Sequence, residues 1–402
     1  MREKSILYLD VETTIKNKGE EAIGKHQASP FHPDNRIVWI GWKWDKWSFQ
    51  VQTSKECHSV GKELYGRFDG HPNPEACYRL VAQNVSFDLL HLMVADKEWQ
   101  KWTDTGEIWD VMLAEYLLTG QQHKWASLDE LSTKYGGTVK DSRMKEYWEQ
   151  GVCTSDIPDD EIEPYLHEDV ANLSIIYRAQ LEEARKKGMM ELIKSQMDAR
   201  LATIMMEFNG MYFDKEVAEK EAEMLRKEYS QIESGLKAAI NVVVPELTED
   251  EINPNSNTQI SSVLFGGNIK VVRKEAMLDE EGNPILFKSG TRKGLVRTKN
   301  VTIEVGCGGL YVPSTTKGAN GSYPVGNDIL KKLDDDTGLV ENILRLREFK
   351  KQLSTYFEGY SQLVFPDGCI HGSLNHCQTN TGRLSSSQPN LQNISNKESG
   401  ND

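Results

Sequence analysis

Acidic side chains at fixed spacing near the N-terminus are the residues of this chain best suited to catalysis. The segment LYLDVETT places Asp10 and Glu12 two residues apart in an apolar run that favours a β-strand. Side chains alternate along a strand, so both carboxylates face the same side, roughly 7 Å apart. Two like charges on an apolar strand are costly unless a cation lies between them. The pair therefore predicts a metal site; the alternative is a solvated strand end.

Two further segments in the first half of the chain add carboxylates. In AQNVSFDLL, Asp88 stands at the start of a predicted helix, just after a strand, with Asn84 and Phe87 beside it. In YLHED, Tyr165 and Asp169 are four residues apart and share one face of a helix. Taken singly, Asp88 could be an ordinary helix cap and Asp169 an exposed acid. The ordered set D-x-E, N-x-x-F-D and Y-x-x-x-D is a more specific signal than any of its parts.

In order, spacing and local structure, these motifs resemble the DEDD-type 3′→5′ proofreading exonucleases with the tyrosine variant, over roughly the first 180 residues. The resemblance implies an RNase H-like α/β domain, in which helices flank a mixed sheet. It also implies two divalent cations, Mg²⁺ or Mn²⁺, which together can activate water and stabilise the leaving oxygen. The expected substrate is the single-stranded 3′ end of DNA, contacted by Asn84 and Phe87.

The same resemblance assigns a role to each catalytic residue. Asp10 is expected to bridge the two ions. Glu12 and Asp169 are expected to complete the site of the ion that activates water, and Asp88 to help hold the second ion. Tyr165 is expected to orient the attacking water.

Segments of the second half resemble the family A DNA polymerases, the DNA polymerase I type. ARLATIMMEFNGMYFD resembles the segment that follows the exonuclease domain in that family. INPNSNTQISSVLFGG resembles the thumb segment that touches duplex DNA, with Asn253, Asn255 and Ser256 at its polar positions. ILRLREFKKQLSTY resembles a thumb helix, on which Arg347 and Lys351 would face the phosphate backbone together. For Lys351 alone, an ordinary solvated charge is an equal alternative.

The segment TGRLSSSQPNLQNI is the most specific match to this family and corresponds to the edge of the palm. The resemblance implies that Arg383 reaches the minor groove at the primer terminus, with Asn390, Gln392 and Asn393 nearby. Minor-groove acceptors are similar for every base pair, so such contacts would sense pairing geometry and not sequence.

No counterpart of the family's palm carboxylates follows that segment within the 402 residues. EYSQIES, at 228–234, is similar to a palm motif but precedes TGRLSS and lies in a helical apolar stripe. We therefore expect the exonuclease and thumb half of a split polymerase, acting on primer–template duplex with a separate palm and fingers chain in replication. The alternatives are a non-catalytic DNA-gripping assembly subunit and a free-standing 3′→5′ exonuclease from a truncated polymerase.

Composition divides the chain into three predicted regions, because all nine tryptophans precede residue 150 and the long helical patterns follow residue 190. We expect the exonuclease domain at 1–190, a mainly helical thumb with connecting helices at 191–365, and an incomplete palm edge at 366–402. The palm edge is expected to order only against a partner chain. A β-rich insertion at about 265–325 interrupts the thumb, and its residues 268–300 hold eight Lys/Arg and four acids.

The net charge of −14 leaves acids for metal binding and does not exclude a local basic face. The chain has no apolar run of the ~20 residues that a membrane helix needs, and its six cysteines form no CxxC pair. These features predict a cytoplasmic protein, bacterial or in a phage-infected cell, without a membrane partner. The cluster at Cys369, His371, His376 and Cys377 has a spacing that fits no common zinc pattern. We expect His26, His32 and His91 to be solvated or structural.

Overall fold

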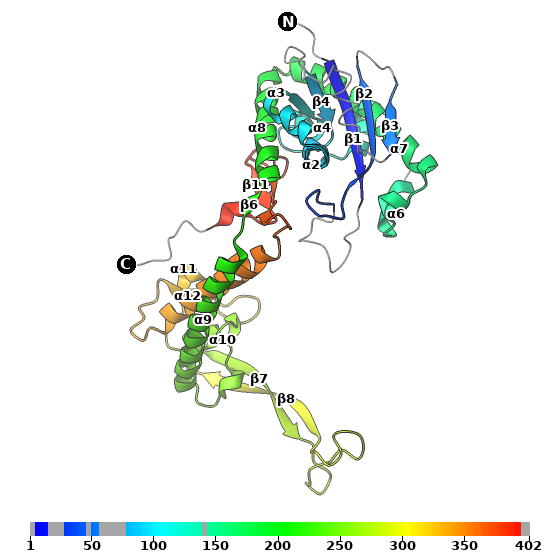
Figure 1. Cartoon of the computed structure of the whole chain (residues 1–402). Helices are drawn as coiled ribbons and strands as arrows, with labels where there is room; N and C mark the ends of the chain where they lie inside the picture. The colour runs from blue at the N-terminus through cyan, green and yellow to red at the C-terminus, as the bar shows by residue number, and fades with distance from the viewer. Residues whose placement is uncertain (1–4, 15–27, 46–49, 56–77, 139–142, 395–402) are drawn as a thin grey trace. The chain divides into compact units, whose positions relative to one another are not determined.

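The computed structural model describes residues 5–14, 28–45, 50–55, 78–138 and 143–394. Its contacts divide the chain into two compact units: residues 1–214 with 360–402, and residues 215–359 (Figure 1). This division differs from the predicted boundaries after residues 190 and 365. No helix in the described ranges is long and apolar enough to cross a membrane.

The first unit is built on a five-stranded mixed sheet with the strand order β3-β2-β1-β4-β5. β1 lies at its centre, antiparallel to β2 and parallel to β4, while β4 is parallel to β5. The apolar residues of β1 are buried, which explains the run seen in the sequence. This mixed sheet with flanking helices confirms the expected α/β architecture. The strands are β1 (Ser5–Thr13), β2 (Ile37–Trp44), β3 (Gln52–Lys55), β4 (Tyr78–Ala82) and β5 (Glu107–Asp110).

The helices of this unit arise where apolar residues recur at three-to-four spacing. The long α7 (Asp159–Lys186) buries Ile162, Leu166, Val170 and Leu173 completely and packs along β1 and β2. It begins directly after Pro158, and neither Asp159 nor Asp160, in its first turn, caps it with a side chain. The other helices are α2 (Val85–Ala95), α3 (Gln100–Thr105), α4 (Val111–Leu118), α5 (Leu128–Tyr135), α6 (Arg143–Glu149) and α8 (Met190–Asn209).

Residues 360–394 belong to the first unit and pack on α8. Arg200 of α8 donates to the carbonyl of Leu374 at 2.8 Å. The Glu207 carboxylate of α8 accepts from the Leu374 N–H and, at 2.7 Å, from the Ser86 hydroxyl of α2. α8 therefore joins the palm-edge segment to the sheet unit, so the boundary lies after α8 and not after residue 190. The described part of this segment, residues 366–394, is folded within the chain. Its strands are β6 (Met211–Tyr212) with β9 (Cys369–Ile370), and β10 (Ser373–Asn375) with β11 (Ser385–Ser387).

The second unit is mainly helical, with a core formed by the apolar faces of α9 (Lys215–Val243), α10 (Asn257–Phe265) and α12 (Leu339–Lys351). The short α11 (Asn327–Leu330) precedes α12. The EYSQIES segment lies inside α9, in agreement with its apolar stripe. The segment ILRLREFKKQLSTY, which resembles a thumb helix, is α-helical as far as Lys351. It continues as a π-helix over Gln352–Gly359, in which each turn is wider.

The predicted β-rich insertion forms a long antiparallel hairpin of β7 (Gly267–Ala276) and β8 (Thr298–Cys307). Ile269, Val271 and Val305 anchor its base in the core of the second unit. Beyond the strands, residues 277–297 fold back on themselves through bridges between Leu278 and Pro284 and between Leu286 and Val296.

Candidate active site

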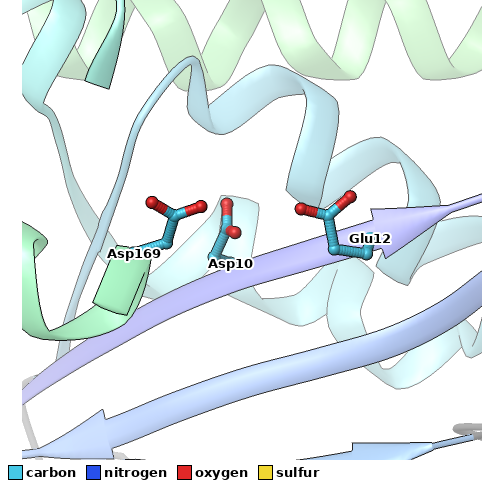
Figure 2. A group of neighbouring side chains, drawn as sticks. All are labelled: Asp10, Glu12 and Asp169. Carbon is cyan, nitrogen blue, oxygen red and sulfur yellow. The ribbon is translucent and has the colours of Figure 1, made fainter. Parts of the chain in front are cut away.

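Three carboxylates from two distant segments meet on one side of the central strand. β1 supplies Asp10 and Glu12, and α7 supplies Asp169; one oxygen of each lies within 4.8 Å of the others. Figure 2 shows all three pointing to the same side, with Asp10 between its two partners. Asp169 is buried, whereas Asp10 and Glu12 are half-buried. The structure thus brings together three of the four acids singled out in the sequence.

A glycine that the sequence analysis missed allows this approach. Gly41 of β2 is the cross-strand partner of Asp10. A Cβ at this position would lie 2.8 Å from Leu166 Cγ and 3.0 Å from Val170 Cγ2. Both of these side chains are fully buried on α7 and flank Asp169 in the sequence. The missing side chain therefore lets α7 lie close to the sheet and brings Asp169 beside Asp10.

Asp88, the fourth acid, lies next to this trio on α2. Its side chain is buried, and its Oδ1 accepts the Val11 N–H of β1 at 3.1 Å. Its Oδ2 accepts no hydrogen bond from the described residues. Burial raises the pKa of Asp88 well above its usual range, and the negative charge of Asp10 raises it further. A cation at this point would relieve both costs.

Tyr165 stands one helical turn before Asp169 and packs edge-on against Trp148, with ring centroids 5.9 Å apart. Burial raises the pKa of its phenol, as do the carboxylates of Asp169, Glu12 and Asp10. The hydroxyl group therefore stays protonated and can donate a hydrogen bond beside the acids.

Asp110, at the end of β5, fixes the helix that carries Asp88. Its fully buried carboxylate accepts the N–H groups of Asn84 and Val85 at 3.0 and 3.2 Å, at the start of α2. It also accepts those of Met112 and Leu113, at the start of α4. One anion thus caps two helices. The sequence signal, an Asp between a strand and a helix in WDVML, is too common to have identified this role.

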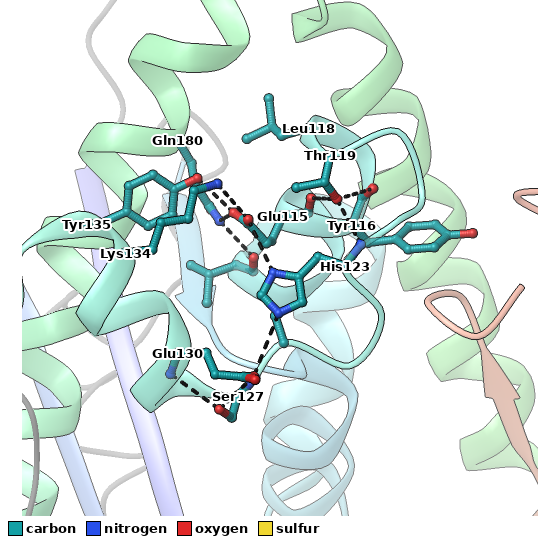
Figure 3. Close-up of polar contacts among 12 residues, drawn as sticks. Glu115, Tyr116, Leu118, Thr119, His123, Ser127, Glu130, Lys134, Tyr135 and Gln180 are labelled. Carbon is teal, nitrogen blue, oxygen red and sulfur yellow. Dashed lines mark hydrogen bonds and ion pairs between the residues drawn. The ribbon is translucent and has the colours of Figure 1, made fainter. Parts of the chain in front are cut away.

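A second buried acid holds α7 in place. Glu115 of α4 accepts from Lys134 Nζ and from the Tyr135 hydroxyl of α5, each at 2.7 Å, and from Gln180 Nε2 of α7 at 3.3 Å (Figure 3). Gln180 also donates to the Val111 carbonyl at 2.9 Å. Although burial favours the neutral acid, the hydrogen bonds from Lys134 and Tyr135 outweigh it and lower the pKa of Glu115. The network ties together the three helices that set the position of Asp169.

Comparisons with known proteins find similarity to DNA polymerases. Residues 304–402 match the family described as DNA polymerase family A. DNA polymerase I of Geobacillus stearothermophilus is 26% identical over 327 residues, which cover 78% of this chain and 30% of the relative. DNA polymerase I of Bacillus caldotenax is 27% identical over 322 residues, with 77% and 29% covered. These matches support a family A DNA polymerase. The chain spans about 30% of the length of these curated relatives.

A solved structure has a similar fold. The POL domain of Pol1 from M. smegmatis, in complex with DNA primer-template and dNTP, has a TM-score of 0.57 and 17% sequence identity to this chain. The match covers 98% of this chain and 53% of that one. At this identity the likeness extends to the fold alone.

The DNA-contact candidates of the first unit line a cavity of about 410 Å³. Asn84 and Phe87, from the first turns of α2, line it together with the half-exposed Trp125. The Asn84 side chain accepts from Arg200 at 3.2 Å, so it is oriented by α8. Residues of α2, the helix that carries Asp88, and of the palm-edge segment both line this cavity.

The candidates in the thumb segment of the second unit have local structural roles. Asn253 Oδ1 accepts the Asn255 N–H at 3.0 Å, and Asn255 donates to the Tyr229 hydroxyl at 2.8 Å. Ser256 caps α10 by accepting the Gln259 N–H at 3.4 Å. These residues shape the turn before α10, and contact with DNA stays a prediction.

Arg347 and Lys351 differ in their surroundings, although both lie on α12. Arg347 donates to the Val325 carbonyl at 2.6 Å and to Asn257 Oδ1 at 2.9 Å. Its guanidinium therefore holds the segment before α11 against the start of α10. Lys351 is exposed and open to a phosphate group.

In the palm-edge segment, Arg383 is exposed, whereas its neighbours hold a turn. Asn390 Oδ1 accepts the Gln392 N–H at 3.2 Å, and Gln392 Nε2 donates to the Leu384 carbonyl at 2.8 Å. Asn393 ends the same short helical turn, Leu391–Asn393. Their contact with primer–template DNA stays a prediction.

The histidines have structural partners. His371 contacts the Glu207 carbonyl at 2.8 Å and Asp367 at 2.9 Å, and His376 contacts Thr203 at 2.9 Å. Within the described ranges, the acidic trio is the one group with metal-binding geometry, so the Cys/His cluster near the C-terminus gains no support as a zinc site. His32 and His91 are buried, and His26 lies outside the described residues.

Proposed function

We propose that the first unit is a metal-dependent 3′→5′ DNA exonuclease that proofreads newly made ends during replication. The observation that carries this proposal is the meeting of Asp10, Glu12 and Asp169 within 4.8 Å, with the buried carboxylate of Asp88 beside them. The order of these acids along the chain, and the tyrosine one turn before the last, support the same reading.

The donor set fits divalent cations. Carboxylate oxygens are hard ligands, which suit Mg²⁺ and Mn²⁺, and Mg²⁺ binds through few carboxylates because it keeps several waters. The buried Oδ2 of Asp88 gains a partner if a cation binds there. Asp10, Glu12 and Asp169 would hold one ion, and Asp10 with Asp88 a second. When bound, such ions stabilise the negative charge of the phosphodiester and make a bound water acidic.

The remaining residues bind and orient the substrate. The Tyr165 hydroxyl, whose pKa is raised by burial and by the nearby acids, would orient the attacking water beside Asp169. Phe87 and Trp125 offer ring faces on which an unpaired base can stack, and stacking tolerates any base. Such a site accepts an end of any sequence, as proofreading requires.

The relatives named DNA polymerase I are much longer than this chain, so a role for it in DNA polymerisation is a proposal. We propose that the exposed Lys351 and Arg383 contact primer–template duplex, with Asn390, Gln392 and Asn393 shaping the palm-edge contact. A separate palm and fingers chain stays a prediction, which copurification from the native source would test.

The decisive experiment uses the purified chain, a 5′-labelled primer–template with a mismatched 3′ end, Mg²⁺ and nucleotides. We expect stepwise shortening from the 3′ end. Asp10→Ala should abolish it, and Asp198→Ala, an exposed acid on α8, should not. Shortening that survives Asp10→Ala would contradict the site. No shortening by the unaltered chain would favour the non-catalytic DNA-gripping subunit.

A further inference from the structure

The far part of the long hairpin concentrates positive charge in an otherwise acidic chain. Residues 282–303, here called the basic arm, contain five Lys/Arg and no Asp or Glu, whereas the whole chain carries a net charge of −14. The arm comprises the second half of the fold-back and the start of β8. Its basic residues are Lys288, Arg292, Lys293, Arg297 and Lys299.

Backbone hydrogen bonds give the basic arm a defined shape. Arg297 N–H donates to the Ile285 carbonyl at 2.7 Å, and Ile285 N–H donates to Met277 at 2.8 Å. Phe287 N–H donates to the Leu295 carbonyl at 2.9 Å. Three chain segments are therefore joined side by side, and the basic side chains project from a fixed scaffold.

Two arginines of the arm gather on one aromatic ring. The guanidinium carbons of Arg292 and Arg297 lie 5.9 and 5.7 Å from the centroid of the Phe287 ring. The ring face attracts both cations, which offsets part of their mutual repulsion and holds them near one another. Paired guanidinium groups match the oxygens of a phosphate group.

The basic arm lacks the counter-charges that other parts of the same hairpin have. Nearer the core, Lys270 pairs with Glu304 at 3.4 Å, and Arg273 pairs with Glu251 at 2.7 Å. Within the described ranges, none of the five basic groups of the arm forms an ion pair like these, although Glu275 stands opposite Lys299 in the hairpin register. Their charge is thus available to an external anion.

We propose that the basic arm binds the phosphate backbone of duplex DNA. This inference rests on the proposed function insofar as DNA is the substrate. Lysine is depleted in protein–protein interfaces, so an arm in which three of five cations are lysines favours a polyanion over a protein partner. Phosphate contacts carry no sequence information, so the arm would hold any duplex.

The number of contacts sets the expected effect. Each neutralised phosphate contributes about 0.9 to the slope of log affinity against log salt. Loss of Arg292, Arg297 and Lys299 should reduce that slope by about 2–3. The affinity at 0.1 M salt should fall about 10- to 500-fold.

The test is fluorescence anisotropy of a labelled duplex with the full chain, in Ca²⁺, over a series of salt concentrations. The triple variant Arg292→Gln, Arg297→Gln, Lys299→Gln is compared with Lys145→Gln, Lys186→Gln, Arg226→Gln. The second set removes equal charge at sites already paired with acids. A flatter slope in the first variant alone supports the proposal. Equal slopes in the first variant and the unaltered chain would overturn it.

Two additions separate the alternatives. Phe287→Leu keeps all charges but removes the ring, and it should weaken binding by less than the triple variant. Retention of the chain on immobilised polyglutamate tests whether the arm binds an acidic protein instead. If the triple variant loses this retention but still binds DNA as the unaltered chain does, the arm binds an acidic protein and the proposal fails. Hydrolysis of a short single strand should persist in the triple variant, and duplex binding should persist in Asp10→Ala, so failure of the nuclease and failure of the arm are distinguishable.

Discussion

Replacing Gly41 with alanine tests how closely the helix with Asp169 must approach the sheet. The added Cβ would lie 2.8 Å from Leu166 Cγ, whereas carbon atoms pack best at about 3.5–4.0 Å. α7 would therefore have to move by about 0.7–1.2 Å at this point. Leu166 and Val170 are both fully buried, so neither side chain can turn out of the way.

Two effects of different size follow from this shift. Overpacking of a buried contact costs about 1–3 kcal/mol of unfolding free energy. Misplacement of catalytic groups by about 1 Å can cost about a hundredfold in rate. We expect Gly41→Ala to remain folded and to lose most of its Mg²⁺-dependent hydrolysis, because Asp169 and Tyr165 move with α7.

The assay combines single-turnover hydrolysis of a labelled single strand with urea unfolding. Gly306→Ala is the matched control, since its Cβ would meet only Asn268 Oδ1, at 3.9 Å, and its stability should change by less than about 0.5 kcal/mol. The double variant Gly41→Ala, Leu166→Ala should recover part of the hydrolysis lost in Gly41→Ala, because the closest clashing atom, Leu166 Cγ, is gone and only the contact with Val170 remains. Hydrolysis by Gly41→Ala at the unaltered rate would refute the reasoning.

Three more predictions concern the surroundings of the site. Tyr165→Phe should slow single-turnover hydrolysis about 10- to 100-fold and leave Mn²⁺ binding, followed by electron paramagnetic resonance, unchanged. Glu115→Gln should lower the unfolding free energy at neutral pH by about 1–2 kcal/mol. Since the folded pKa of Glu115 lies below the usual 4.5, this difference should shrink as the pH falls below about 4.5, in urea titrations at each pH. Asp110→Ala should lower the unfolding free energy by about 3 kcal/mol or more in the same assay. Two helix starts lose their acceptor, and Arg200, whose Nε lies 4.0 Å from Asp110 Oδ2, loses its counter-ion. An unchanged urea midpoint would contradict the double-cap role.

Local periodicity sufficed to predict which acids share a face. Alternation along a strand put Asp10 and Glu12 on one side, and helical spacing put Tyr165 one turn before Asp169. Nothing in these patterns shows that β1 and α7 meet, because this depends on a glycine on a third element, β2. The family resemblance supplied that convergence, and the packing around Gly41 gives its physical cause.

Long-range partners also explain where sequence reasoning stopped short. The spacing of Arg347 and Lys351 predicted two phosphate-facing cations, but Arg347 is engaged by the Val325 carbonyl from a segment 22 residues away. Composition predicted a domain boundary after residue 190. The structure places α8 in the first unit instead, because Arg200 and Glu207 contact residue 374. Contacts of this kind leave no periodic signal.

The order in which the first unit is assembled has a consequence for its synthesis. All of residues 215–359 must leave the ribosome before the segment that packs on α8 emerges. At the usual 5–20 residues per second, the Glu207 carboxylate would wait roughly 10 s or more for the Leu374 N–H. During this interval the nascent chain exposes a surface of α8 that the finished protein covers. Transiently exposed surface of this kind is what chaperones cover on incomplete domains, and slower translation of the second unit would lengthen that exposure.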